Sequence, residues 1–332
     1  MLIEVSEASQ TGEARRKATA FAEELQMSET QCGEVALVTT EMATNLVKHA
    51  GRGHILFRPL KASGREGLQI TSVDKGPGIR DISHALSDGP LAEGSLGSGL
   101  GTIRRVPDSF DLYSVPGSGT VISAEFWLPG TQNKVPMPLE VGIVSEPIRG
   151  EEFCGDGWVV RHSEDGALLM VVDGLGHGPL ASEAAREAEQ VFSSTKAPSL
   201  VGILTDIHDA LRKTRGAAVA IAKIDVQKGL LTFAGIGNIG GAIVTQDSGR
   251  NMTSHNGTLG QRMERAQEFT YPWNSDSILV MYSDGLVSRW DLERYPGIWN
   301  KPASVTAALL HRDFNRGRDD VTVLVAKAAR PQ

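Results

Sequence analysis

The spacing of apolar positions in the first 130 residues switches between helical and strand periods. A period of about 3.6 residues predicts helices over residues 9–25 and about 29–49. Ser28 precedes the second helix and Gln31 follows three residues later, a capping-box arrangement that satisfies free amide groups at a helix start. A period of two predicts strands at residues 2–6, 54–60, 67–74, 109–115 and 119–127. This region is therefore predicted to be a layered α/β unit with a largely antiparallel sheet.

A polar segment with three prolines, from Pro129 to Pro138, separates this region from the rest of the chain. Such a composition is typical of a linker, which we place at residues 131–138, between domains 1–130 and 139–330. Beyond it, β-rich runs recur at 139–145, 157–163, 167–173, 217–225, 229–235, 241–246, 277–283 and 320–326, with helical stretches at about 179–194 and 199–213. Many strands and few helices predict a β-sandwich flanked by helices, so the whole chain is α+β.

Composition narrows the classes of protein. A chain of 332 residues with 40% hydrophobic and 22% charged residues is long enough for two cores, which excludes disordered and fibrous classes. Residues 1–130 hold 12 basic and 16 acidic residues, and 131–332 hold 21 and 24, so neither part is basic. A nucleic-acid or anionic-membrane partner is therefore not expected.

Cys32 and Cys154 lie far apart and outside any zinc-ligand spacing, so we interpret them as small buried hydrophobic residues in a reducing compartment. The first ten residues lack the features of a signal peptide. The apolar runs are far shorter than the ~20 residues that cross a bilayer. These patterns predict a cytoplasmic protein.

Candidate chemistry begins on the predicted helix 29–49, where Glu41 and Asn45 are four residues apart and so leave the same face. Taken alone, such a pair more often lies on the solvent-exposed face of a helix and has no catalytic role. The strand that follows ends in Asp74, with Gly76 and Gly78 directly after it. This sequence fixes a carboxylate beside a backbone that a ligand can approach closely, although a tight turn explains it equally well.

A glycine-rich segment, Gly97, Gly99 and Gly101, runs into a helical stretch at residues 102–106. Free amide groups at a helix start favour phosphate binding, whereas a flexible loop is the structural alternative. No buried strand precedes these glycines, as a dinucleotide-binding fingerprint requires, and no Gly-Lys-Ser/Thr follows, as a Walker loop requires. For Arg104 and Arg105, surface positions are favoured over phosphate contacts.

In this order, the three motifs resemble those of the GHKL ATPase/kinase family, and more narrowly the RsbT-like serine kinases of stress-signalling partner switches. The resemblance spans about residues 1–130 and implies a Bergerat α/β sandwich that binds ATP with Mg²⁺. It implies that Asn45 coordinates Mg²⁺ and that Asp74 accepts a hydrogen bond from the adenine amino group. It further implies that the Gly97–Gly101 loop closes over phosphate, and that Glu41 orients or deprotonates the attacking serine hydroxyl.

The second domain places aspartates at the ends of predicted strands, mostly beside glycine: Asp156, Asp173, Asp284 and the pair Asp319 and Asp320. One such step is usually a turn. Several carboxylates from separate strands, however, can build a site for two Mg²⁺ or Mn²⁺ ions without His or Cys, since these cations prefer oxygen ligands.

This pattern resembles the PPM family of metal-dependent Ser/Thr phosphatases, in its bacterial SpoIIE, RsbU and RsbX branch. The resemblance implies that Asp173 bridges two Mn²⁺ or Mg²⁺ ions, with the Gly174 carbonyl as a further ligand. It also implies that Asp284 and Asp319 complete one metal shell, that Asp156 acts through a metal or its water, and that Asp320 orients that shell. His177 is a candidate proton donor to the leaving serine oxygen, with a packing role as the favoured alternative, and Asn238 resembles a family turn.

Together, the two resemblances predict a bifunctional partner-switching regulator. It would phosphorylate and dephosphorylate a STAS-domain protein or anti-sigma-factor antagonist of a stress-response pathway, in a stressosome-like assembly. The main alternative is a PPM-type phosphatase whose N-terminal domain is a non-catalytic ATP-binding module, either anti-sigma-like or a sensor. A further alternative is a non-enzymatic scaffold.

Overall fold

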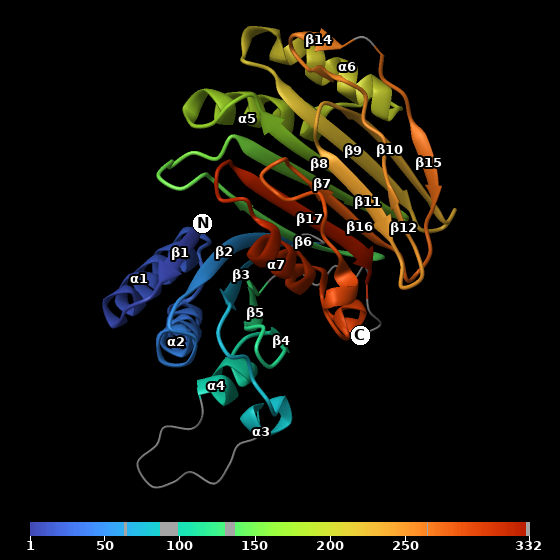
Figure 1. Ribbon diagram of the computed structural model, residues 1–332. Helices are drawn as coiled ribbons and strands as arrows, with labels where there is room; N and C mark the ends of the chain where they lie inside the picture. The colour runs from blue at the N-terminus through green and yellow to red at the C-terminus, as the bar shows by residue number, and fades with distance from the viewer. Residues whose placement is uncertain (63–64, 87–98, 130–136, 264, 330–332) are drawn as a thin grey trace, which may run out of the picture. The chain divides into compact units, whose positions relative to one another are not determined.

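A computed structural model describes residues 1–62, 65–86, 99–129, 137–263 and 265–329 (Figure 1). The chain divides into two compact units, Met1–Lys134 and Val135–Gln332. Most of the linker predicted at 131–138 lies outside the described residues.

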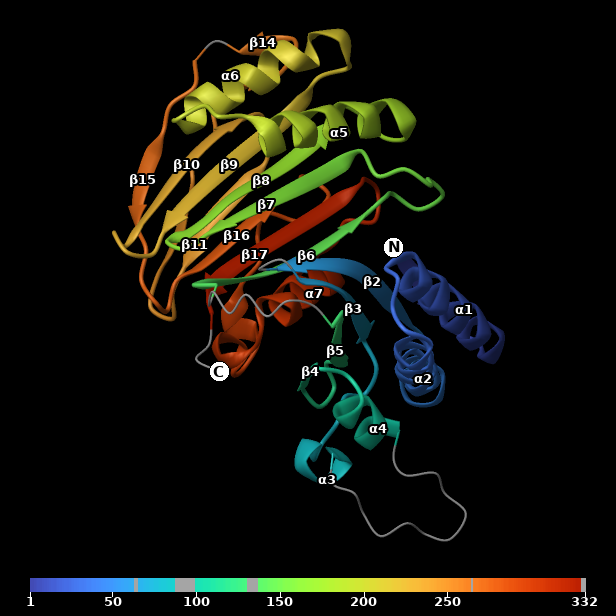
Figure 2. The same cartoon turned by 180° about the vertical axis from the view of Figure 1, so that it is seen from behind.

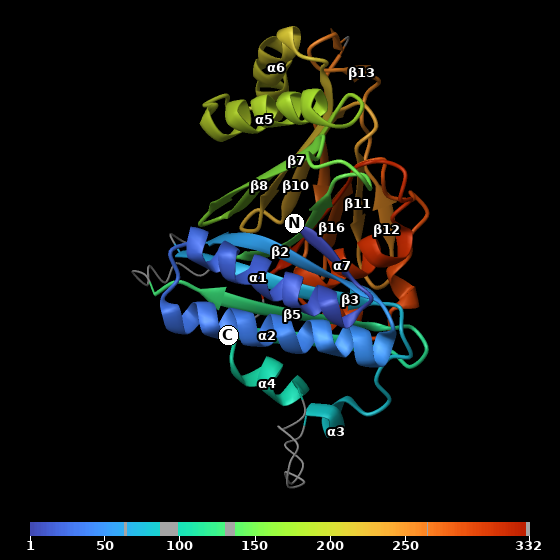
Figure 3. The same ribbon diagram turned by 90° about the vertical axis from the view of Figure 1, so that its left-hand side faces the viewer.

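The first unit is built on one antiparallel sheet of five strands in the order β1-β2-β3-β5-β4. The strands are β1 (Leu2–Val5), β2 (Gly53–Ala62), β3 (Arg65–Asp74), β4 (Ser109–Ser114) and β5 (Thr120–Trp127). The helices are α1 (Ala8–Glu24), α2 (Glu29–Asn45), α3 (Ile82–Leu86) and α4 (Gly99–Arg105). Figure 3 shows α1 and α2 running side by side across one face of the sheet, where their apolar residues and those of the sheet form one core. The predicted layered α/β unit is confirmed.

Helix α2 starts as the sequence predicts. Ser28 Oγ accepts a hydrogen bond from Gln31 N at 3.3 Å, and Gln31 Oε1 accepts one from Ser28 N at 3.2 Å, which completes the capping box. Its α-helical part ends at Asn45, earlier than predicted, and the chain continues as a π-helical turn, η1 (Leu46–Ala50). Such turns are frequent at functional sites.

The second unit is a sandwich of two five-stranded sheets, in the orders β15-β10-β9-β8-β7 and β12-β11-β16-β17-β6, in which every pair of strands is antiparallel. The first sheet holds β7 (Asp156–Ser163), β8 (Gly166–Gly174), β9 (Ala217–Asp225), β10 (Leu230–Ile236) and β15 (Phe269–Pro272). The second holds β6 (Leu139–Glu146), β11 (Gly240–Val244), β12 (Gly249–Asn251), β16 (Ile278–Tyr282) and β17 (Val321–Ala328). A short hairpin pairs β13 (Gly257–Thr258) with β14 (Arg262–Met263). One apolar core lies between the two sheets.

Helices cover the outer faces of this sandwich (Figure 2). Helices α5 (Pro179–Ser194) and α6 (Leu200–Ala210) pack on the first sheet, and α7 (Ala303–Phe314) packs on β6 and β17 of the second. Both helices predicted here are confirmed, although α6 gives way to a 3₁₀ turn at Leu211–Lys213. Short 3₁₀ turns also lie at Leu292–Arg294 and Ile298–Asn300.

Two smaller features bear on the sequence-based expectations. No helix in the described part of the chain is long and apolar enough to cross a membrane. Cys32 is buried and Cys154 is half-buried, and both thiols are free.

Two candidate active sites

In the first unit, Glu41, Asn45 and Gly99 lie together. Glu41 and Asn45 leave α2 one turn apart, and the first residue of α4 packs against them. A Cβ atom at position 99 would overlap Glu41 Oε2 and lie 3.8 Å from Asn45 Oδ1. Glycine at position 99 therefore lets α4 approach these two side chains without moving the Glu41 carboxylate. Gly97, predicted to belong to the same loop, lies outside the described residues.

Asp74, the last residue of β3, is fixed by backbone amides. Its Oδ1 accepts hydrogen bonds from Gly76 N at 2.7 Å and from Thr120 N at 3.2 Å. Gly78 has a φ of +66°, which favours glycine, and lies close to the Val115 carbonyl. Thr120 was missed by sequence reasoning because it is 46 residues away along the chain and reaches Asp74 only through the strand order β3-β5.

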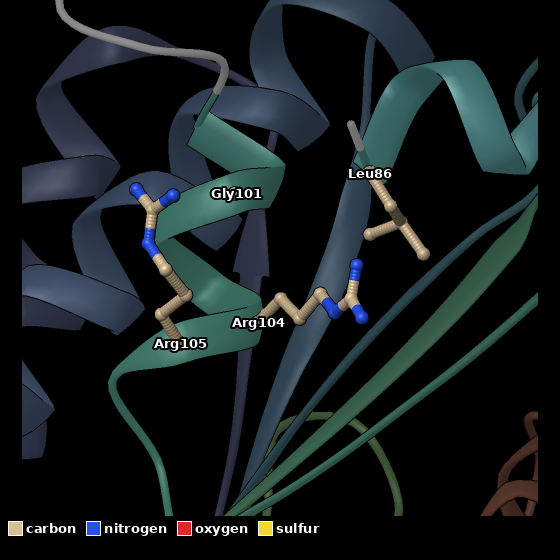
Figure 4. Close-up of a pocket in the computed structure, with 4 residues that line it drawn as sticks. All are labelled: Leu86, Gly101, Arg104 and Arg105. Carbon is tan, nitrogen blue, oxygen red and sulfur yellow. The ribbon is translucent and has the colours of Figure 1, made fainter. Parts of the chain in front are cut away.

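A pocket of about 300 Å³ lies beside α4, lined by Leu86, Gly101, Arg104 and Arg105. Figure 4 shows the Arg104 side chain extending toward Leu86, while Arg105 leaves α4 in another direction. Both arginines are exposed, as the sequence predicts. The pocket therefore places two positively charged side chains beside the helix that carries the glycine motif.

One buried polar atom shows that the first site suits a polar ligand. Asn45 Nδ2 is buried and has no hydrogen-bond partner among the described residues. Burying an amide without a partner is costly, so a group that binds beside Asn45 and accepts this hydrogen bond removes that cost. A side-chain amide and a carboxylate also offer oxygen atoms, the donors that Mg²⁺ prefers. These residues fit a nucleotide with its divalent ion.

In the second unit, the register of β7 and β8 brings the first two acids together. Asp156 opens β7 and pairs directly with Asp173 near the end of β8. The loops behind them are joined, since Gly174 N donates to Gly155 O at 2.9 Å. Gly174 itself is buried and packs against the Ala181 carbonyl.

Asp156 is a buried carboxylate, 7% exposed, held by a serine hydroxyl. Ser283 Oγ donates to Asp156 Oδ2 at 2.5 Å and accepts from Thr322 N at 2.9 Å. Burial raises the pKa of Asp156, and the nearby charges of Asp320 and Asp284 raise it further. Ser283 was missed in the sequence, although it directly precedes the Asp284-Gly285 step.

Asp320 binds the two segments that lead to Asp156. Its Oδ1 accepts from Ile148 N at 2.6 Å, and its Oδ2 accepts from Gly155 N at 2.7 Å. Asp319 is adjacent, and its Oδ1 accepts from Asp320 N at 3.0 Å. Asp320 thus holds two backbone segments in place, while the role expected for it, to orient a metal shell, stays a prediction.

Asp284 and Asp173 complete the group. Asn238 Nδ2 donates to Asp284 Oδ2 at 2.7 Å. Burial raises the pKa of Asp173, and so do the charges of four other acids: Asp156, Asp284, Asp319 and Asp320. Burial also raises the pKa of Asp284, with a further contribution from Asp319. We call these five aspartates, 156, 173, 284, 319 and 320, the acidic cluster.

His177 lies apart from these hydrogen bonds. Its Nδ1 is 2.9 Å from Glu151 Oε1, and its side chain is 59% exposed. Glu151 was not singled out in the sequence, because nothing in its local pattern places it beside a histidine 26 residues away. The proton-donor role of His177 stays a prediction.

The acidic cluster is not a complete metal cage made of protein. Within the described ranges, no three His, Cys, Asp or Glu side chains are arranged to hold one ion among them. Mg²⁺ usually keeps several waters and takes only one or two carboxylates directly, so an open set of acids still suits it. Burial first of all, and then the neighbouring carboxylates, raise the pKa values of Asp156, Asp173 and Asp284, and a bound divalent cation would favour their ionised forms. The residues fit divalent ions held partly through water, while the individual ligand assignments stay predictions.

Comparison with known families agrees with this division. The family model described as "Histidine kinase-like ATPase domain" matches residues 5–126, and that of "Stage II sporulation protein E (SpoIIE)" matches residues 163–329, half of the chain. The expected pairing of a GHKL-type domain with a SpoIIE-type phosphatase domain is confirmed.

Individual relatives fall into the same two classes. The serine/threonine-protein kinase RsbT of Bacillus subtilis (strain 168) is 37% identical over 115 residues, which are 35% of this chain and 86% of the relative. The phosphoserine phosphatase RsbX of the same strain is 24% identical over 139 residues, 41% of this chain and 69% of the relative. A solved structure from work on the bacterial stressosome as a modular system adapted to control secondary messenger signalling aligns with a TM-score of 0.54 and 31% identity. It covers 57% of this chain and 99% of its own.

Proposed function

Because the chain belongs to the SpoIIE family through its second unit and to the RsbT-like histidine kinase-like ATPases through its first, we propose that it is a two-site regulator. In this proposal the first unit phosphorylates a serine of a partner protein with ATP, and the second unit removes that phosphate. The observation that carries the proposal is the presence of two separate sets of polar residues, one in each unit. Each set is drawn together from distant parts of the sequence.

For the kinase, the proposed roles follow from the contacts of the side chains. Asn45 would help hold the Mg²⁺ of MgATP, which neutralises charge on the phosphate oxygens. Asp74, fixed by Gly76 N and Thr120 N, would accept from the adenine amino group. Glu41 would accept the proton of the serine hydroxyl as its oxygen attacks the γ-phosphorus, while the bond to ADP breaks. Such a base typically contributes about 10²–10⁴-fold to the rate.

For the phosphatase, the acidic cluster would hold the divalent ions, which neutralise phosphate charge and favour deprotonation of water. Asp173, Asp284, Asp319 and the Gly174 carbonyl are the proposed ligands, with Asp156 acting through an ion or its water. Ser283 and Asp320 keep Asp156 and its loop in position through the hydrogen bonds described above. Water attacks phosphorus, the bond to the serine oxygen breaks, that oxygen takes a proton, and inorganic phosphate leaves. His177 is the proposed donor of that proton.

The proposed substrate of both reactions is one STAS-domain protein of a stress-response pathway, acted on within a stressosome-like assembly. The likeness of the two units to RsbT and RsbX supports this proposal, as does the solved stressosome relative. Joining the two activities in one chain raises the local concentration of each around a shared substrate.

The test separates the two activities by substitution. We expect Glu41→Ala to abolish transfer of label from γ-labelled ATP to serine of a STAS protein and to leave phosphate release unchanged. We expect Asp173→Asn to lower phosphate release by more than about 100-fold, because even loss of an outer-shell partner at a metal site costs about 10–100-fold. This second variant should keep its kinase activity.

Matched controls are Glu23→Gln and Asp247→Asn, exposed acids of the first and second unit, which should keep both activities. Loss of both activities in a folded Glu41→Ala or Asp173→Asn protein would contradict the two-site proposal. A phosphatase rate that responds to ATP without any serine phosphorylation would favour a sensor role for the first unit.

A further inference from the structure

Among the described residues few large apolar side chains are exposed, and several of them lie near the proposed catalytic acids. In the part of the chain that the structure describes there are seven: Met1, Leu37, Phe153, Leu175, Leu180, Leu230 and Val287. Single exposed apolar residues are normal at a protein surface, so exposure alone carries no argument. Three of the seven lie within two or three residues of the acidic cluster: Phe153 before Asp156, Leu175 after Asp173, and Val287 after Asp284.

The loops that carry these side chains are packed together. Gly174 N donates to Gly155 O at 2.9 Å, which joins the loop of Leu175 to the loop of Phe153. Leu180, half exposed, precedes Ala181, whose Cβ would lie 2.7 Å from a Cβ at position 155. Phe153, Leu175 and Leu180 therefore belong to one region of the surface.

Val287 joins the same region through the backbone of its own loop. Gly285, two residues earlier, packs against the carbonyl of Asp320. Asp320 in turn accepts from Gly155 N at 2.7 Å. We call Phe153, Leu175, Leu180 and Val287 the apolar rim.

A ligand seated on the apolar rim would place its own atoms beside the acidic cluster, as a substrate of that site must do. The four apolar side chains come from three loops and the first turn of α5. They extend beyond a single phosphoserine, and they offer no charge or hydrogen bond to a small phosphate ester. Exposed apolar side chains gathered around a site favour contact with a protein over contact with a small polar ligand. On the basis of the proposed phosphatase function, we infer that the apolar rim binds a protein segment in which apolar side chains flank the phosphoserine.

An exposed apolar side chain also lies next to Glu41, the proposed base of the kinase. Leu37 is 44% exposed and precedes Glu41 by four residues on α2, so both side chains leave the same helix face. A serine with apolar flanks would present the same side chains to α2 before phosphorylation as to the apolar rim afterwards. The kinase and the phosphatase would therefore both recognise a serine that has apolar residues on either side of it.

The probes are three synthetic ten-residue phosphoserine peptides with Leu, Ser or Lys on both sides of the phosphoserine. With the full chain and Mn²⁺, we expect kcat/KM to be about tenfold higher for the Leu-flanked than for the Ser-flanked peptide, which corresponds to about 1.4 kcal/mol. Leu180→Ser should reduce this ratio toward one. A preference for the Lys-flanked peptide would overturn the inference, because attraction to the acidic cluster would then select the substrate.

Leu230→Ser is the matched control, because Leu230 is 39% exposed but lies far along the sheet. Leu230 pairs with Asp225, which pairs with Gly166 at the start of β8, whereas Asp173 lies near the end of that strand. This variant should keep the tenfold ratio. An equal loss of the ratio in both variants would contradict docking at the apolar rim.

p-Nitrophenyl phosphate separates failure of the inference from failure of the proposed function. All rim variants should hydrolyse it at the rate of the unchanged protein, which also shows that they fold. If the unchanged protein fails to hydrolyse it with Mn²⁺, the proposed phosphatase function is wrong. If it hydrolyses p-nitrophenyl phosphate but gives equal kcat/KM for the Leu- and Ser-flanked peptides, only the inference is wrong.

The kinase half is tested with the unphosphorylated Leu- and Ser-flanked peptides. Leu37→Ser should lower kcat/KM for the Leu-flanked peptide about tenfold, equivalent to about 1.4 kcal/mol, and leave the KM for ATP unchanged. Equal use of the two peptides by the unchanged protein would overturn this half of the inference. Phosphorylation of neither peptide, nor of a STAS protein, would count against the proposed kinase itself.

Discussion

At the scale of single residues, Ser283 shows how the fold holds a buried carboxylate. Its hydroxyl donates to Asp156 and accepts from Thr322 N, so it connects β7, β17 and the segment after β16. All three groups are buried. Because buried polar groups depend on their partners, this hydroxyl is expected to matter for stability as well as for the position of Asp156.

We predict that Ser283→Ala lowers the free energy of unfolding of the second unit by about 1–3 kcal/mol, since it leaves the carboxylate and an amide without partners. Urea unfolding of the full chain measures this change. Ser193→Ala is the control, because Ser193 is exposed on α5, and it should cost less than about 0.5 kcal/mol. Equal effects of the two substitutions would contradict the assigned role of Ser283.

The acidic cluster makes a prediction about pH. The pKa values of Asp156 and Asp173 are raised above the usual carboxyl value, first of all by burial. In the metal-free protein, the folded state therefore binds more protons than the unfolded state above about pH 4. The free energy of unfolding should therefore be highest below that pH, and it should fall as the pH rises toward the raised pKa values of these two carboxyl groups.

Scanning calorimetry in EDTA between pH 5 and 8 tests this sign. The melting temperature of the second unit should fall with rising pH, and saturating Mn²⁺ should reduce the fall because the cation compensates the ionised carboxylates. Asp173→Asn should flatten the dependence in EDTA. A melting temperature that rises with pH in EDTA would show that the cluster is not desolvated as described.

At the scale of elements, the contact of α4 with α2 controls the first site. The start of α4 lies where a Cβ would overlap Glu41 Oε2. We predict that Gly99→Ala displaces α4 or Glu41 and weakens MgATP binding about tenfold, since overpacking typically costs about 1–3 kcal/mol. Equilibrium binding of a fluorescent ATP analogue provides the measurement.

Gly33→Ala on α2 is the matched control for this substitution. No atom lies within 4 Å of the Cβ that it adds, and alanine favours a helix interior over glycine by about 1 kcal/mol. It should leave MgATP affinity unchanged and slightly raise stability. Unchanged affinity in the Gly99→Ala protein would show that α4 does not limit the site.

There are physical reasons why some helices and strands could be predicted from the sequence and others could not. The longer strands and helix α5 are found in the sequence because their apolar residues repeat with a clear period, whereas the short edge strands β12 and β15 were not predicted. Helix α7 was not predicted, since ten of its twelve residues are buried and the segment lacks a polar face. Helix α4 was predicted only as a short helical stretch after the glycines, because its packing against α2 is tertiary.

At the scale of the whole molecule, each unit has cores of its own. The apolar core of the first unit is made only of its own residues, and the same holds for the cores between and outside the sheets of the second. Separate cores allow separate cooperative transitions. The two units are also proposed to bind different ligands.

We therefore predict two unfolding transitions for the full chain on heating. Mn²⁺ alone should raise only that of the second unit, by about 5–10 °C at a concentration 100-fold above its Kd. Asp173→Asn should lack this shift. A single transition that moves as a whole with Mn²⁺ would show that the units unfold together.

The sequence by itself determined the motifs of the two families, the longer strands and most helices, because these depend on residues close together in the chain. It also singled out Glu41, Asn45, Asp74 and the aspartates beside glycine. Only the tertiary structure decided which groups meet: Thr120 with Asp74, Ser283 with Asp156, and Glu151 with His177. These partners come from strand order, register and loop packing, which depend on contacts between segments that no local pattern records.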